Sequence, residues 1–156
     1  MSLNYLNRIK QFMIRLYRNN LFLGNKSLNK IPDMIIKCYA CNEHPEYRTE
    51  LLLNCSMTNK LLQFLIRILR KAGSLMNSCR IEIFLFKDYS INSIENLSLM
   101  FTWKYVYNCK YNKSSPIVKS FARAFRGLIA IITHMSLPQL LMARNVLDIL
   151  NSELDR

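Results

Sequence analysis

Glycine is scarce in this chain: the 156 residues include only three glycines, which stand alone at Gly24, Gly73 and Gly127. Phosphate-binding loops and the dinucleotide fingerprint need several glycines within a few residues. The sequence also contains no G-x-S-x-G nucleophile elbow. Its two histidines, His44 and His134, have no obvious catalytic partner nearby in the sequence. These absences predict a protein that is not an enzyme and that binds no cofactor.

Acidic residues are also few, with 10 acidic against 22 basic residues and a formal net charge of +12. None occurs before Asp33, between Glu50 and Glu82, or between Glu95 and Asp148. These acid-free windows contain most of the lysine and arginine. Segregated positive charge favours a polyanionic partner, either RNA in a ribonucleoprotein or an anionic membrane surface. The alternative explanation of the positive charge is that the proteins of the source organism are basic in general.

Long uncharged apolar runs are missing too. The longest candidate, residues 117–135, is interrupted by Lys119, Arg123 and Arg126, whereas a membrane-spanning helix needs roughly 18 or more apolar residues in a row. The five cysteines form no even set, and no signal peptide precedes them. We therefore predict a chain that does not cross a membrane and lies in a reducing, intracellular compartment.

The first 24 residues are predicted to form a basic amphipathic helix, followed by a linker at 25–32 and a single domain at 33–156. Apolar and polar residues separate onto two faces at helical period over residues 3–23, and the polar face contains no acid. Three interpretations stay open: a helix docked on the core, an interfacial membrane helix, or a targeting peptide. The residues expected to contact a membrane are Arg8, Phe12, Arg15, Leu16, Tyr17 and Arg18.

Two β-hairpins are predicted within the domain. Residues 34–41 and 47–55 flank the turn sequence NEHP, and residues 80–86 and 97–109 flank a longer loop. The last of these segments has the cleanest alternation of period two in the chain. We therefore expect an α+β fold: an antiparallel sheet of about four strands, with one face covered by helices.

Three helices are predicted to cover that sheet. The first occupies residues 58–72, with Thr58 as its N-cap and Gly73 at its C-terminal end. The second has Pro116 at its first helical position. The third begins at Ser136 and continues to about residue 151.

Two of these helices have polar faces that are basic and lack acids. Surface helices usually gain stability from Glu–Lys pairs four residues apart, and these faces have none. Solvation explains a polar face, whereas contact with the phosphates of RNA or lipid also explains the missing acids. The predicted polyanion-binding residues are Lys60, Arg67, Arg70 and Lys71 on the first helix, and Lys119, Arg123 and Arg126 on the second.

The aromatic run FTWKYVYNCKY resembles surfaces on which single-stranded nucleic acid stacks. In a strand, however, Phe101, Trp103 and Tyr105 share their face with Leu97 and Leu99. We therefore expect this stripe to pack beneath the helices.

The stretch KCYACNEH contains part of a zinc-binding pattern. Cys38 and Cys41 have C-x-x-C spacing, His44 follows, and Cys55 is a candidate fourth ligand. Against zinc, no glycine or other turn-forming residue follows Cys41 to close a knuckle. In a strand, moreover, Cys38 and Cys41 point to opposite faces. We therefore predict buried free thiols and no metal site.

The layout of residues 47–135 resembles that of rhabdovirus matrix proteins, the small ones of plant-infecting members in particular. The segments concerned are EYRTELLLNC, NKLLQFLIRILRKAG, RIEIFLF and LSLMFTWKYVYNC. The resemblance is in the order of elements, and no family residue can be assigned to a position here. It implies a structural protein of the host cytoplasm and virion that self-associates and bridges a ribonucleoprotein to the inner leaflet of a membrane. The alternative is a ribosomal or other RNA-binding assembly protein.

Overall fold

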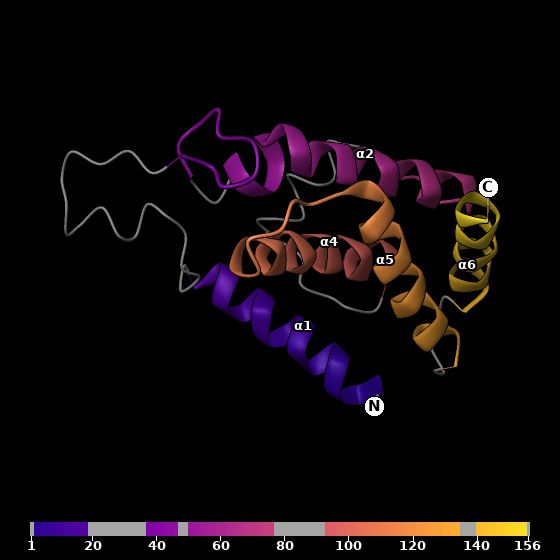
Figure 1. The fold of residues 1–156 in the computed structure, drawn as a ribbon. Coiled ribbons are helices and arrows are strands. Elements are labelled where there is room, and N and C mark those ends of the chain that lie inside the picture. Colours follow the sequence, from indigo (N-terminus) through magenta and orange to yellow (C-terminus); the bar gives the residue numbers. More distant parts are fainter. Residues whose placement is uncertain (1, 19–36, 47–49, 77–92, 135–139, 156) are drawn as a thin grey trace.

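The computed structural model describes residues 2–18, 37–46, 50–76, 93–134 and 140–155, and this part of the chain is almost entirely helical (Figure 1). Within these ranges, the only strand-type pairing is one antiparallel bridge between Lys37 and Pro45. The predicted α+β fold with a four-stranded sheet is therefore wrong. The elements in chain order are α1 (Ser2–Tyr17), η3 (Glu50–Asn54), α2 (Ser56–Lys71), α4 (Ile94–Tyr111), α5 (Val118–Thr133) and α6 (Leu140–Leu154).

Helix α4 is the central element, in contact with α1, α2 and α5 (Figure 1). Every residue from 97 to 103 is buried, and on a helix this stretch covers all sides. The buried hydroxyls of Ser98 and Thr102 donate to the carbonyls of Ile94 and Ser98, at 2.6 and 2.8 Å. Residues 97–109 were predicted as a strand because a helix that is apolar all round has no polar stripe to reveal its period. The expectation that Phe101 and Trp103 lie in the core is confirmed.

The first predicted hairpin is absent from the described residues. Residues 50–54, placed in a strand by their apolar run, form the single π-helical turn η3, and the backbone N–H of Cys55 closes it by donating to the Glu50 carbonyl at 2.6 Å. Residues 39–41, also predicted as strand, belong to a turn. The predicted strand at 80–86 and the linker at 25–32 lie outside the described residues.

Helices α2, α4 and α5 meet in an aromatic cluster. The ring of Phe121 on α5 lies 5.3 to 6.1 Å from the rings of Tyr105, Phe125, Phe101 and Phe64, centroid to centroid. Helices α5 and α6 pack closely against each other, and α6 also contacts α2. The core is therefore formed where these helices converge.

Two predicted helix starts are wrong. Helix α2 begins at Ser56 with Cys55 as its N-cap, so Thr58 is inside the first turn and is buried. Helix α5 begins at Val118, two residues after Pro116. The predicted start of the third helix at Ser136 lies outside the described residues, and α6 continues to Leu154.

Helix α1 is docked on α4 through its apolar side. Ile9 and Leu16 are buried, and the ring of Phe12 lies 5.4 Å from that of Tyr107. The Lys104 ammonium lies 4.9 Å from the centre of the Tyr5 ring. Of the three interpretations of this segment, the structure therefore shows the docked helix.

Two glycines provide a matched pair of stability predictions. Gly73 ends α2 with φ +97°, where a side chain is strained, whereas Gly127 lies inside α5, and a Cβ at either position meets nothing within 4 Å. We expect Gly73→Ala to lower the free energy of unfolding by about 1 kcal/mol and Gly127→Ala to raise it by about 0.5–1 kcal/mol. Urea unfolding followed by circular dichroism measures both changes. If the two substitutions changed the free energy of unfolding in the same direction, the assigned end of α2 would be contradicted.

Candidate functional site

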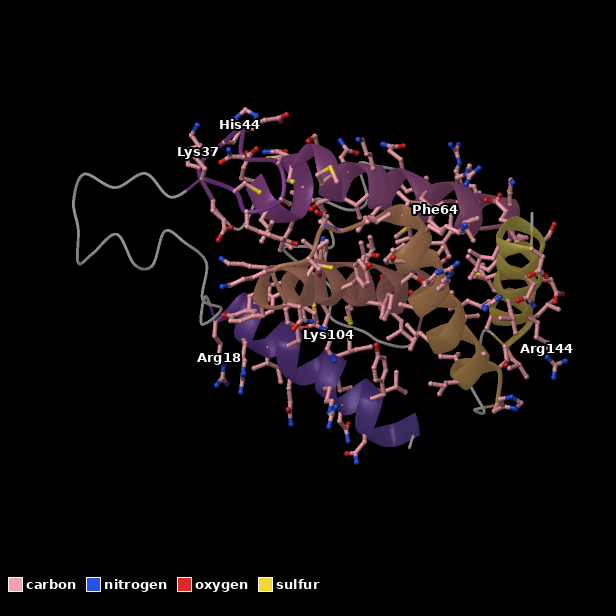
Figure 2. The ribbon with its side chains drawn as sticks, viewed as in Figure 1. Arg18, Lys37, His44, Phe64, Lys104 and Arg144 are labelled. Atoms are coloured by element: carbon pink, nitrogen blue, oxygen red, sulfur yellow. The ribbon has the colours of Figure 1, made fainter. Side chains whose placement is uncertain are left out.

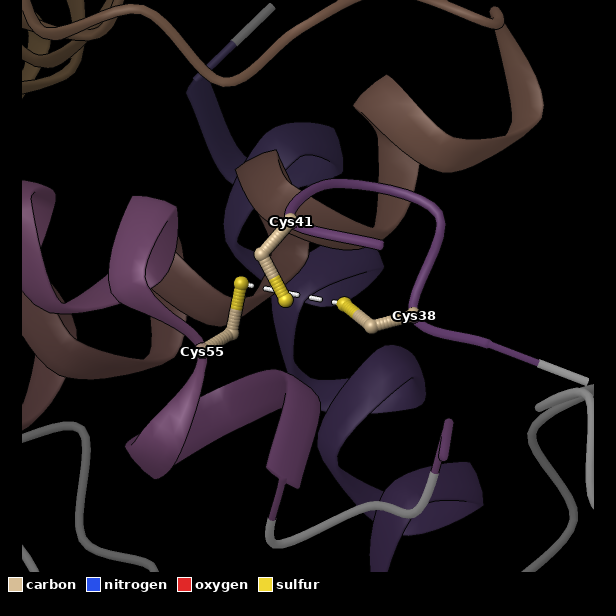
Figure 3. Close-up of side chains that lie close together, drawn as sticks. All are labelled: Cys38, Cys41 and Cys55. Carbon is tan, nitrogen blue, oxygen red and sulfur yellow. Dashed lines mark hydrogen bonds between the residues drawn. The ribbon is translucent and has the colours of Figure 1, made fainter. Parts of the chain in front are cut away.

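Three cysteine side chains converge beside the N-terminus of α2 (Figure 3). Cys38 and Cys41 come from the loop of residues 37–46, and Cys55 is the N-cap residue of α2. Their sulfur atoms all lie within 4.8 Å of one another, and the Cys38 thiol donates to the Cys55 sulfur at 3.7 Å. Cys38 and Cys55 are buried, while Cys41 is half-buried and forms the more accessible edge of the cluster.

The loop that carries Cys38 and Cys41 is closed by its own backbone. The Asn42 N–H donates to the Cys38 carbonyl at 2.9 Å, and the Cys38 N–H donates to the His44 carbonyl at 2.7 Å. Asn42 has φ 58°, in the left-handed region, which asparagine tolerates better than most residues. The expectation that no turn-former follows Cys41 is therefore wrong, because Asn42 has that role. The two cysteines consequently point to the same place instead of to opposite faces.

The sulfur atoms of the cluster differ in their electrostatic surroundings. The Cys38 thiol and the backbone N–H groups of Thr58 and Met57 stabilise the charged form of Cys55 against burial, which lowers the pKa of Cys55 to about 5. The pKa of Cys38 is raised, because its thiol donates to Cys55 and is itself buried. Backbone N–H groups of Cys41 and Ala40 act in the opposite direction on Cys38. Both buried sulfurs therefore have amide donors two and three residues ahead of them.

His44 does not join this cluster. Its side chain is 57% exposed and its Nε2 lies 3.9 Å from a carboxylate oxygen of Glu50. Of the four candidate zinc ligands, the structure thus brings together Cys38, Cys41 and Cys55 but not His44. Cys38 and Cys55 are buried as predicted, whereas Cys41 is only half-buried, and the convergence of the three was not foreseen.

The loop of residues 37–46 is held against α4 by polar contacts at two positions. The Tyr39 hydroxyl donates to the Val106 carbonyl at 2.8 Å. The Glu46 carboxylate, 1% exposed, accepts from the Tyr39 backbone N–H at 3.1 Å and from the Lys110 ammonium. These contacts keep Cys38 and Cys41 facing the N-terminus of α2.

The predicted basic face of α2 is partly neutralised in the fold. Arg67 and Lys71 both donate to the Glu153 carboxylate of α6, each at 2.7 Å. The Arg67 guanidinium also lies 5.4 Å from the centre of the Phe64 ring. Because Glu153 is more than 80 residues away in sequence, no local pattern could have revealed this pairing. Lys60 and Arg70 are exposed, and no described acid pairs with either.

The basic residues predicted on α5 have no such counter-charge among the described residues. Lys119 and Arg123 are exposed and Arg126 is half-buried. His134 is the exposed C-cap residue of α5. This face therefore stays a candidate for contact with anions.

The outer face of α1 carries a group of exposed cations that no acid of the same helix accompanies. Arg8, Lys10, Arg15 and Arg18 are all exposed along α1 and its end, and residues 2–18 include no acid. Lys104 of α4 lies beneath α1, where burial and the charge of Arg8 lower its pKa. Arg18 projects away from the molecule, and Lys104 lies between the two helices (Figure 2).

Two of the residues predicted to contact a membrane are not at the surface. Phe12 is 7% exposed and Leu16 is 1% exposed, both against the core, and the side chain of Tyr17 is not among the described ones. Arg8, Arg15 and Arg18 are exposed. The structure therefore separates the five described side chains into a buried apolar pair and an exposed basic set, and membrane contact stays a prediction.

The chain matches no known protein-family model, and no curated protein or solved structure is significantly similar to it. The layout that suggested a matrix protein assumed strands at 47–55 and 97–109, where the described residues form η3 and α4. Among the described helices, none combines the length and the apolarity needed to cross a membrane.

Proposed function

We propose that this protein is a non-enzymatic assembly protein that binds the phosphate backbone of RNA through the outer face of α1. The observation that carries the proposal is the set of exposed cations Arg8, Lys10, Arg15 and Arg18 along α1 and at its end, where residues 2–18 contain no acid. By contrast, Arg67 and Lys71 of α2 already share the Glu153 carboxylate. The cations of α1 and of α5 have no such partner among the described residues, and α1 with its end has more exposed ones, four against two.

The burial of the apolar side of α1 favours RNA over a membrane as the partner. An interfacial helix inserts its apolar side roughly 5–10 Å into the headgroup boundary, but Phe12 and Leu16 are packed against the core. Binding to phosphates needs only the cationic side. From Arg8 to Arg18, α1 and its end extend for about 15 Å, long enough to meet several phosphates.

The test is the salt dependence of binding to a fluorescently labelled single-stranded RNA, measured by fluorescence anisotropy. Each phosphate contact adds about 0.7 to the slope of log affinity against log salt. We expect the triple variant Arg8→Gln, Arg15→Gln, Arg18→Gln to lower that slope by about 2 and to weaken binding about tenfold or more. Circular dichroism should show unchanged helix content, because the three side chains are exposed.

The matched control removes the same charge from α5, as Lys119→Gln, Arg123→Gln, Arg126→Gln. A much smaller loss in this variant supports the α1 face. Equal losses of RNA affinity in both variants would mean that binding depends only on the total charge of the protein. The α1 proposal would then be rejected.

A second arm addresses the membrane. The intact chain is floated with vesicles of phosphatidylcholine, with and without phosphatidylserine, at the same salt. We expect weak or no flotation, because the apolar side of α1 is occupied by α4. Firm flotation with the anionic vesicles, together with no RNA binding, would replace the RNA proposal by a membrane-binding one.

A further inference from the structure

The geometry points to a metal site: we infer that Cys38, Cys41 and Cys55 bind one Zn²⁺ ion through three thiolates. The inference is independent of the proposed RNA contact, since the cluster lies at the N-terminus of α2 and none of its residues belongs to α1.

The spacing of the sulfur atoms suits tetrahedral zinc. A Zn–S bond of about 2.3 Å in tetrahedral geometry places neighbouring sulfurs about 3.8 Å apart. The sulfurs of Cys38 and Cys55 are 3.7 Å apart, and all three lie within 4.8 Å of one another. The two remaining distances both involve Cys41, the half-buried member, and neither exceeds 4.8 Å.

The surrounding backbone is arranged as zinc thiolates require. Ligating groups are normally oriented by donors in an outer shell, and here amide N–H groups of Ala40 and Cys41 serve Cys38 while those of Met57 and Thr58 serve Cys55. The left-handed conformation of Asn42 and the Cys38–His44 backbone bond close the loop around the site. Both features restrict the backbone of the loop. Buried thiols that bind no metal would not require this restriction.

The ligand set selects the kind of ion. Thiolates favour zinc and other soft ions, whereas magnesium and calcium prefer oxygen ligands. Among the described residues, no fourth His, Cys, Asp or Glu shares the cluster, and the side chain of His44 is mostly exposed. Within the part of the chain that the structure describes, the fourth position is thus left to water or an external ligand, which would approach on the accessible side of Cys41.

The bound ion would join parts of the chain that are distant in sequence. It would tie the loop of residues 37–46 to the first turn of α2, and that loop is already fixed to α4 through Tyr39 and Glu46. Metal binding would release the protons of the thiols that are protonated beforehand, so affinity should rise with pH.

The experiment uses the intact chain, purified under reducing conditions and stripped with a chelator. Zinc is added back, loose metal is removed by gel filtration, and the bound metal is counted by mass spectrometry. We expect one zinc per chain and a rise in melting temperature on zinc addition. Cobalt(II) in place of zinc should give thiolate-to-metal charge-transfer absorption and the visible bands of a tetrahedral site.

Four single variants identify the ligands. Cys38→Ser, Cys41→Ser and Cys55→Ser should each weaken zinc binding at least tenfold. The matched control is Cys109→Ser, since Cys109 is a buried free cysteine outside the cluster, and it should keep one zinc. Because Cys41 is the least buried of the three, its variant is the one best placed to fold, and circular dichroism checks this.

The cobalt spectrum of the unaltered chain is informative even if every variant unfolds. Absence of both zinc and the cobalt–thiolate bands in a chain whose helix content is intact would overturn the inference. The same holds if Cys38 and Cys55 are found joined in a disulfide with no metal bound, or if the three cysteine variants retain zinc as firmly as Cys109→Ser does. Loss of zinc in His44→Ala would overturn the three-thiolate ligand set.

Discussion

We expect Phe121→Ala to lower the free energy of unfolding by about 3–5 kcal/mol, the usual cost of removing a buried aromatic side chain. Phe121 is fully buried, and its ring contacts the rings of Phe64, Phe101, Tyr105 and Phe125. No single neighbour can fill the space left by the ring, because the rings approach it from α2, α4 and α5. A loss of this size is a large part of the stability of a domain.

The measurement is urea denaturation followed by far-ultraviolet circular dichroism, with the fluorescence of Trp103, the single tryptophan, as a second probe. Phe121→Leu is the matched variant, which keeps most of the buried volume and should cost clearly less. Equal costs for the two substitutions, or a cost below about 1 kcal/mol for alanine, would show that α5 does not pack on α4 as described.

The second large effect is expected from the buried carboxylate of Glu46. Its side chain is 1% exposed and pairs with Lys110, whose side chain is 20% exposed. Removing one member of a buried ion pair leaves the other charge uncompensated, at a cost of about 3–5 kcal/mol. We therefore expect Glu46→Gln to destabilise the protein by about this amount, near the lower end because glutamine can still accept from the Tyr39 backbone N–H.

The double variant Glu46→Gln, Lys110→Met tests the cause. If the uncompensated ammonium is responsible, the double variant should be more stable than Glu46→Gln alone. Lys71→Met is the control, since Lys71 is 52% exposed where it meets Glu153, and exposed pairs contribute at most about 1 kcal/mol. A loss for Glu46→Gln no larger than for Lys71→Met would contradict the burial of the Glu46–Lys110 pair.

Sequence patterns located the amphipathic helices but not the central one. Helices α2 and α5 show a three-to-four residue spacing of apolar side chains, which depends only on which side of the helix faces the core. Helix α4 has no exposed side between residues 97 and 103, so its alternation of Leu97, Leu99, Phe101 and Trp103 matched a strand equally well. Whether such a segment is strand or helix depends on what surrounds it, and α1, α2 and α5 surround it here.

The candidate sites also combine properties that the sequence determines with properties that only the tertiary structure decides. The chain alone determined its excess of positive charge, the absence of acids from its first helix, the C-x-x-C spacing, and the absence of any recognisable catalytic motif. These are properties of composition and local order. Tertiary structure decided that Glu153 neutralises part of α2, that the apolar side of α1 is covered, and that Cys55 meets Cys38 and Cys41. Each of these depends on contacts between residues far apart in the chain, whose distances are set by helix packing and loop closure and leave no local pattern.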